Sequence, residues 1–177
     1  MRLILLCFAL LLYSPLTTNA QSVYTQKPDD PEALFFTSEN FDIASDGKQD
    51  VSEALQLAVN KVKKEKNFGV LFIPEGKYLI SETIHVPKAV RIIGYGEDRP
   101  EFILGENSTG FQDEQNYMFW FTSNLVEEGG QPRDATAGTF YSAISNINFR
   151  IEEGNPNAVA LRTHFAQHSF VSHCNFY

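Results

Sequence analysis

The sequence has few cysteines, few basic residues and no long apolar run. Only 2 cysteines occur in 177 residues, which excludes a small domain held together by disulfides. Lys and Arg number 14 against 22 Asp and Glu, so the formal net charge is −8. This charge argues against nucleic acid as a partner, because a nucleic-acid-binding surface needs clustered basic residues. No segment approaches the roughly 18 uninterrupted apolar residues of a membrane-spanning helix.

The first 20 residues have the pattern of a secretory signal peptide. Arg2 gives a positive start, residues 3–12 are apolar and uncharged, and residues 18–20 read Thr-Asn-Ala. We therefore predict cleavage after Ala20, a secreted or periplasmic protein, and no membrane attachment of the mature chain. An uncleaved membrane anchor is the alternative. Cys174 would be the one cysteine left, so no internal disulfide is expected.

A leader and one amphipathic helix are expected next. Residues 21–40 contain the breakers Lys-Pro-Asp-Asp-Pro and are predicted to be a leader. From Asp50 onward apolar residues recur at helical spacing as far as Val62, and lysines gather before Asn67. Asp50 and Glu53 have the spacing of a capping box, so we predict that Asp50 caps this helix.

After Gly69 the apolar period changes from about 3.6 to 2, which indicates strands. Candidate strands cover residues 70–73, 78–80, 83–86, 90–93 and 102–104, and turn residues separate them. A series of short strands without intervening helices fits a sandwich, a barrel or a solenoid.

An internal repeat favours the solenoid. Ile-Ser-Asn-Ile-Asn-Phe at residues 144–149 recurs as Val-Ser-His-Cys-Asn-Phe at residues 171–176, an offset of 27 residues. If the offset is one coil, Phe149 and Phe176 stack at about 4.8 Å, the spacing of paired strands. Asn148 and Asn175 would stack likewise, and their amides could hydrogen-bond along the axis.

Residues 42–104 resemble the start of a known superfamily. They read D-x-x-x-D-G-x-x-D, an amphipathic helix, V-L-F-I-P-E-G-K-Y-L-I, I-H-V-P and R-I-I-G-Y-G. This order is similar to the N-terminal region of the pectate lyase superfamily, which includes the rhamnogalacturonase, polygalacturonase-related and β-1,3-glucanase groups. The resemblance implies an all-β, right-handed parallel β-helix with an N-terminal capping α-helix. It also implies that residues 41–177 are the N-terminal part of a longer domain.

The resemblance further implies a polysaccharide as partner. Residues 158–168 resemble a segment of the β-1,3-glucanase group, which favours a glycoside hydrolase that needs no metal or cofactor. Two alternatives stay open: a non-catalytic carbohydrate-binding or adhesion β-helix, and a polysaccharide lyase that would require Ca²⁺. The polygalacturonase-type motifs N-T-D, D-D, G-H-G and R-I-K do not occur in the chain. We therefore assign no catalytic residue and expect this chain alone to be inactive.

Three side chains are candidates for substrate binding. If residues around 162 form a strand, Arg162, His164 and His168 share one face, opposite Leu161 and Phe165. A guanidinium and imidazoles can bind sugar hydroxyls or a uronate carboxylate. No Glu follows His164, so the pair of histidines lacks the zinc-hydrolase motif, and no metal site is predicted. The alternative is an outward polar ladder without a ligand.

Trp120 lies in the aromatic run at residues 117–121. It is expected either as the exposed ring of a buried strand or as a sugar-stacking platform.

Overall fold

The computed structural model describes residues 21–177, and the predicted signal peptide lies outside the described residues. Within them the chain forms one helix and three parallel sheets: sheet A (β1-β3-β6-β9-β12), sheet B (β13-β10-β7-β4-β2) and sheet C (β11-β8-β5). The elements are β1 (Leu34–Phe35), β2 (Asp46–Asp50), α1 (Ser52–Lys66), β3 (Gly69–Pro74), β4 (Lys77–Ile80), β5 (Ile84–Pro87), β6 (Val90–Tyr95), β7 (Glu101–Leu104), β8 (Asn116–Thr122), β9 (Ala143–Ser145), β10 (Asn148–Ile151), β11 (Ala158–Arg162), β12 (Phe170–Ser172) and β13 (Asn175–Phe176).

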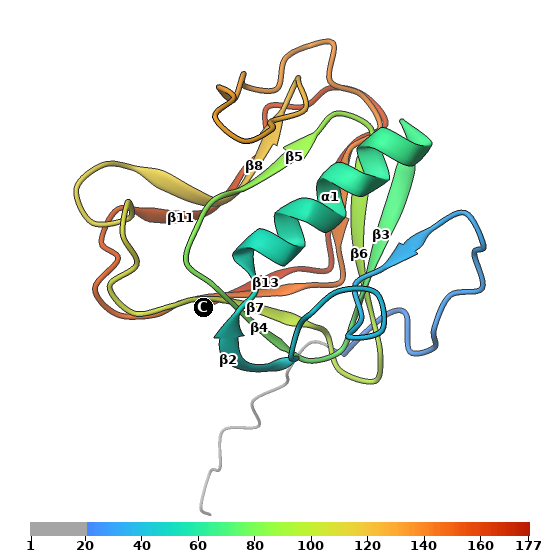
Figure 1. Ribbon diagram of the computed structural model, residues 1–177, viewed down its shortest axis with the longest axis horizontal. Coiled ribbons are helices and arrows are strands. Elements are labelled where there is room, and N and C mark those ends of the chain that lie inside the picture. The colour runs from blue at the N-terminus through green and yellow to red at the C-terminus, as the bar shows by residue number, and fades with distance from the viewer. Residues whose placement is uncertain (1–20) are drawn as a thin grey trace, which may run out of the picture.

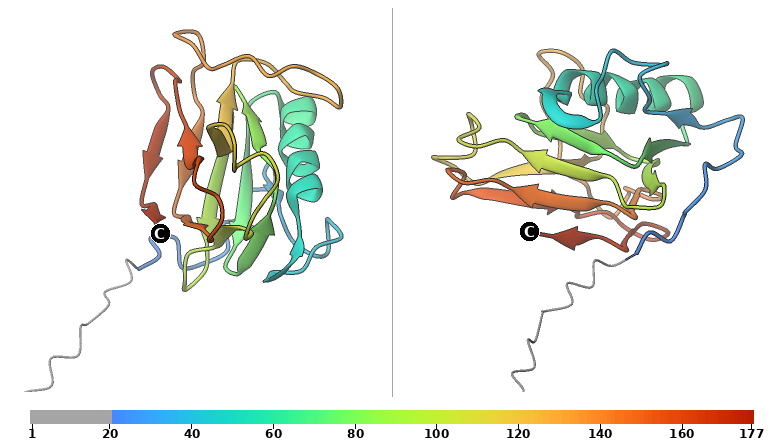
Figure 2. Two further views of the ribbon diagram at one scale, coloured as in Figure 1. Left: turned by 90° about the vertical axis from the view of Figure 1, so that its left-hand side faces the viewer. Right: turned by 90° about the horizontal axis from the view of Figure 1, so that it is seen from below.

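The chain visits the three sheets in turn. After β3, each consecutive strand joins the next sheet. Every strand from β6 onward pairs in parallel with the strand three places before it. The strands consequently stack side by side, with α1 at one end and β12 and β13 at the other (Figure 1, Figure 2). The predicted mostly β chain with parallel strands is confirmed.

The predicted helix is present as α1, but its capping box is wrong. The residue at the N-cap is Val51, and no side chain caps the helix. Asp50 still belongs to β2, where it pairs with Leu79, so its carboxylate accepts from the backbone N–H of Ser52 at 2.8 Å instead. On the apolar face of α1, Leu55, Ala58, Val59 and Val62 are fully buried, and the helix lies against β3, β5 and β6. Within residues 21–177 no helix is both long and apolar enough to cross a membrane.

The strands before the helix were not predicted. β1 lies inside the predicted leader and pairs with β3, and Phe36 directly after it is fully buried. β2 consists entirely of polar residues and glycine, so no apolar alternation marks it. Its pairing with β4 is a tertiary contact that local sequence does not encode.

The 27-residue repeat is confirmed as one coil. Phe149 pairs with Phe176 and with Phe102, and Phe102 pairs with Tyr78, so four rings form one column across sheet B. The Phe149 and Phe176 ring centroids lie 5.3 Å apart with an interplanar angle of 11°. Phe149 is 1% exposed. This aromatic column therefore holds successive coils in register.

The asparagines of the repeat stack as predicted but do not bond to each other. Asn148 pairs with Asn175, yet the Oδ1 atom of Asn148 is buried without a hydrogen-bond partner in the described part of the chain. The Nδ2 group of Asn175 donates to the hydroxyl of Tyr177 at 3.2 Å. Ser145 and Ser172 make the side-chain contact instead, with their hydroxyl oxygens 2.8 Å apart.

Candidate functional site

A column of polar and aromatic side chains crosses sheet C. The strand register places His85 of β5 beside Trp120 of β8, and Trp120 beside Arg162 of β11. Their neighbours Phe119 and Phe121 are buried, whereas these three side chains are only partly buried. The alternation of a strand thus puts apolar rings inside and the column on the outer face. Trp120 is the partly exposed ring of an otherwise buried strand, one of the two expected readings.

The loop after β8 brings a carboxylate to this column. Asp134 forms an antiparallel bridge with Thr122, and the backbone N–H of Ala135 donates to the carbonyl of Phe121 at 3.2 Å. These bonds close residues 123–133 into a loop whose ends are paired. Asp134 is thereby held against the outer face of sheet C.

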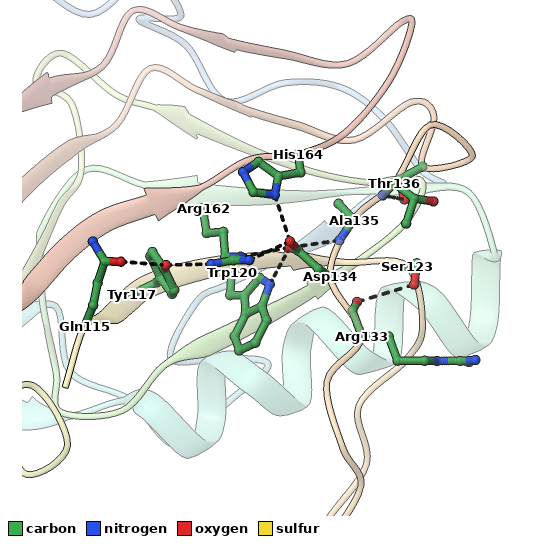
Figure 3. A network of polar contacts seen from close by, with 11 residues as sticks. Gln115, Tyr117, Trp120, Ser123, Arg133, Asp134, Ala135, Thr136, Arg162 and His164 are labelled. Carbon is green, nitrogen blue, oxygen red and sulfur yellow. Dashed lines mark hydrogen bonds and ion pairs between the residues drawn. The ribbon is translucent and has the colours of Figure 1, made fainter.

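Three side chains donate to the Asp134 carboxylate (Figure 3). The Nε and Nη2 groups of Arg162 donate to its two oxygens at 2.9 and 2.7 Å. The indole N–H of Trp120 donates to Oδ1 at 2.9 Å, and Nδ1 of His164 lies 2.7 Å from Oδ2. Such a two-point Arg–carboxylate pair fixes the orientation of both side chains and also stabilises their charges.

Asp134 is ionised near neutral pH. The Arg162 hydrogen bonds, followed by those of Trp120 and His164, outweigh desolvation and hold the pKa of the carboxyl well below its usual range. Asp134 raises the pKa of Arg162 in turn. A carboxylate with this pKa carries no proton near neutral pH. It can position Arg162 and His164, but it cannot act as a general acid.

Arg162 is also held by aromatic rings. Its guanidinium carbon lies 5.0 Å from the ring centroid of Tyr117 and 5.1 Å from that of Trp120, within cation–π range. Its Nη1 group donates to the Tyr117 hydroxyl at 2.6 Å. Three of the five N–H donors of Arg162 are therefore used inside the protein, and the others remain for a ligand.

A hollow of about 320 Å³ lies beside the column. It is lined by Glu82, Thr83, His85, Thr109, Phe111, Asn116 and Trp120. Burial lowers the pKa of His85, so its imidazole is neutral near pH 7 and can both donate and accept. An aromatic ring with hydroxyl, amide and imidazole groups and the carboxylate of Glu82 around it suits a ligand rich in hydroxyls.

The three predicted site residues fall into two places. Arg162 and His164 meet at Asp134, whereas the ring of His168 stacks on Tyr141, with centroids 5.0 Å apart and an interplanar angle of 10°. The predicted common strand face is wrong, because β11 ends at Arg162 and His168 has φ 60° in the turn that follows. A substrate-binding role for each of the three stays a prediction.

Asp134 and His85 were missed by the sequence analysis. Asp134 sits in a polar loop without a motif, and only the pairing of β8 with β11 brings Arg162 to it. The adjacent acidic pairs Glu127-Glu128 and Glu152-Glu153 lie beside Gly129 and Gly154, and Glu127 forms an ion pair with Lys64 at 2.6 Å. In the described range, residues 21–177, no three His, Cys, Asp or Glu side chains gather as a metal site would require.

Comparison with known proteins gives a family and a fold. The sequence pattern of the family described as "Rhamnogalacturonase A/epimerase, pectate lyase-like" matches residues 35–177. Among solved structures the chain is similar to PfbA, a surface adhesin of Streptococcus pneumoniae, with a TM-score of 0.52 and 15% sequence identity. The match covers 81% of this chain and 33% of PfbA, so this chain spans about a third of that protein's length. No curated protein matches the sequence.

Proposed function

The chain belongs to the rhamnogalacturonase A/epimerase, pectate lyase-like family, and from this we propose that it is the polysaccharide-binding N-terminal part of an exported β-helix protein. The observation that carries the proposal is the column of side chains on sheet C, with Asp134 hydrogen-bonded to Arg162 beside it. In this proposal the stacked coils form a right-handed solenoid, the usual hand of parallel crossover connections, and α1 covers its first coil.

The sheet C face suits a sugar chain for three reasons. His164 is 62% exposed and is oriented by an ionised carboxylate that it shares with Arg162. The Trp120 ring borders both the Asp134 cluster and the hollow of about 320 Å³ that contains His85. Aromatic rings beside oriented N–H donors match a sugar, which has an apolar face and a rim of hydroxyls.

We further propose that the longer protein hydrolyses a glycosidic bond, in keeping with the rhamnogalacturonase in the family description. Hydrolysis needs one carboxylic acid that holds a proton and a second carboxylate. Asp134 cannot supply the acid, because its pKa lies too low. The proposal therefore assigns binding to this segment, and the catalytic carboxylates to other parts of the full protein. Non-catalytic adhesion predicts the same binding without bond cleavage.

Export is part of the proposal and rests on the signal-peptide pattern of residues 1–20. N-terminal sequencing of the mature product should start at Gln21 or within a few residues of it. A mature product that keeps Met1 would contradict export.

Substitution of His164 tests the proposed binding face. His164→Ala removes an exposed imidazole but leaves the Arg162–Asp134 pair in place, so the fold should persist. We expect affinity for a bound polysaccharide to fall about fivefold or more, which corresponds to the loss of one hydrogen bond of about 1 kcal/mol. Affinity electrophoresis against a panel of plant and microbial polysaccharides measures it.

His173→Asn is the matched control for this test. His173 is exposed in the turn between β12 and β13, and Asn tolerates its φ of 53°. Its affinity should equal that of the unmodified chain. Equal losses in both variants, or binding to no polysaccharide in the panel, would overturn the proposal.

A further inference from the structure

A second hollow lies where the end of α1 meets the turns that lead from sheet C into sheet A. It measures about 180 Å³ and is lined by Lys63, Asn67, Phe68, Lys88, Ala89, Gly138, Phe140 and Tyr141. These residues come from the end of α1, from the turn before β6 and from the turn before β9. The hollow shares no lining residue with the one beside Trp120.

Its charge is opposite to that of the whole chain. Lys63 and Lys88 both line the hollow, and no lining residue is acidic, although the chain carries a net charge of −8. Within residues 21–177 neither lysine forms an ion pair. The ammonium of Lys63 donates to the carbonyl and to Oδ1 of Asn67, at 2.8 and 2.9 Å, which leaves one of its three N–H groups for a ligand. Burial and then the nearby charge of Lys88 lower the pKa of Lys63. Two cations that line one hollow without an acidic neighbour attract an anion.

Its walls are aromatic and exposed. Phe68 is 50% exposed, Phe140 38% and Tyr141 39%, which is high for such large rings. The centroids of Phe68 and Tyr141 lie 4.9 Å apart, and the ring of Tyr141 stacks on His168. Tyr141 and His168 are 27 residues apart and have φ of 63° and 60°, so they hold the same place in successive coils.

The turns before sheet A thus present an exposed strip of rings, made by Phe68, Tyr141 and His168, beside the two lysines. Exposed apolar rings that gather in one strip, rather than singly, are a feature of binding surfaces. Nucleic acid fits poorly, because it needs a stripe of cations that matches many phosphates. Two lysines neutralise one or two charges, as carried by one or two residues of an acidic sugar chain.

We propose that this hollow binds a carboxylate-bearing sugar residue, with its carboxylate between Lys63 and Lys88 and its ring against Phe68 and Phe140. That the ligand is a polysaccharide rests on the proposed function. The position of the site and its preference for an acidic sugar rest on the lysines and rings that line the hollow, and not on the proposed function. The surface would give the protein a second contact along the same polymer and would favour de-esterified over esterified chains.

Paired lysine substitutions test the proposal on the full chain. Lys63→Gln with Lys88→Gln removes both cations from the hollow. The matched control, Lys48→Gln with Lys61→Gln, removes the same net charge from two exposed lysines outside it. The probes are oligogalacturonate and its methyl ester, which lacks the charge, and calorimetric titration gives the affinities. Urea denaturation verifies that both variants fold.

The hollow variant should bind oligogalacturonate about tenfold more weakly, as expected for two partly exposed charge contacts, and the control less than about twofold. Affinity for the methyl ester should be the same in all three chains. Equal losses in both variants would show a net-charge effect and overturn the proposal. Ester binding that depends on His164, without any effect of the hollow variant, would overturn this site but leave the proposed function standing. Failure to bind either probe would overturn this site, and failure on the whole polysaccharide panel would overturn both.

Discussion

At the scale of single residues, Asp134 organises the sheet C face. Its two oxygens accept from Arg162 of β11, from Trp120 of β8 and from His164 in the turn after β11. None of these contacts is local in sequence, since Asp134 lies 28 residues from Arg162. The side chain is 29% exposed, so solvent screens the ion pair only in part.

Asp134→Asn should lower the free energy of unfolding by about 1–2 kcal/mol at pH 7, between the values for exposed and buried ion pairs. The folded-state pKa is lowered from 3.8, so the carboxylate stabilises the fold above that pH. The benefit fades as pH falls below 3.8, and the variant should approach the unmodified chain there. Urea denaturation at several pH values measures the difference.

Asp113→Asn is the control for this series, because Asp113 is exposed and, among the described residues, has no ion pair. Its stability should follow that of the unmodified chain at every pH. A pH-independent difference for Asp134→Asn would show that its ionisation contributes nothing.

At the scale of the element, the repeat that joins β10 to β13 is the best test of coil register. Phe149 is 1% exposed and stacks between Phe102 and Phe176. Phe149→Ala should therefore cost about 3–5 kcal/mol, as buried Phe truncations do. Ser145→Ala removes one hydroxyl contact and should cost about 1 kcal/mol. Equal shifts of the denaturation midpoint would contradict the register.

The elements that the sequence predicts are those with a local signal. All five candidate strands between residues 70 and 104 occur within one or two residues of their expected ends, because apolar alternation and turn residues bound them. β2 was missed because it is polar, and the capping of α1 was misjudged because Asp50 pairs with Leu79. His168 was misplaced for the same kind of reason, since the end of β11 depends on its pairing with β8.

At the scale of the whole molecule, the stacked coils spread two candidate binding surfaces over different sides. Sheet C carries the ionised Asp134 cluster, and the end of α1 with the turns into sheet A carries two lysines without an ion pair, in the described part of the chain, among exposed rings. Only the residue identities of the second surface were visible in the sequence. Bringing Lys63 to Lys88 requires α1 to pack against the first coils, which is a tertiary contact.

The central claim is that sheet C binds a polysaccharide at Trp120, and the sequence offers a built-in reporter. Trp120 is the only tryptophan in the 177 residues, and its indole N–H is bonded to Asp134. Oligosaccharides of a polysaccharide that the chain binds should change the Trp120 fluorescence in a saturable way, and His164→Ala should shift that titration to higher concentration. The account would be contradicted if calorimetry showed binding without any change in Trp120 fluorescence, and if His164→Ala left the affinity unchanged.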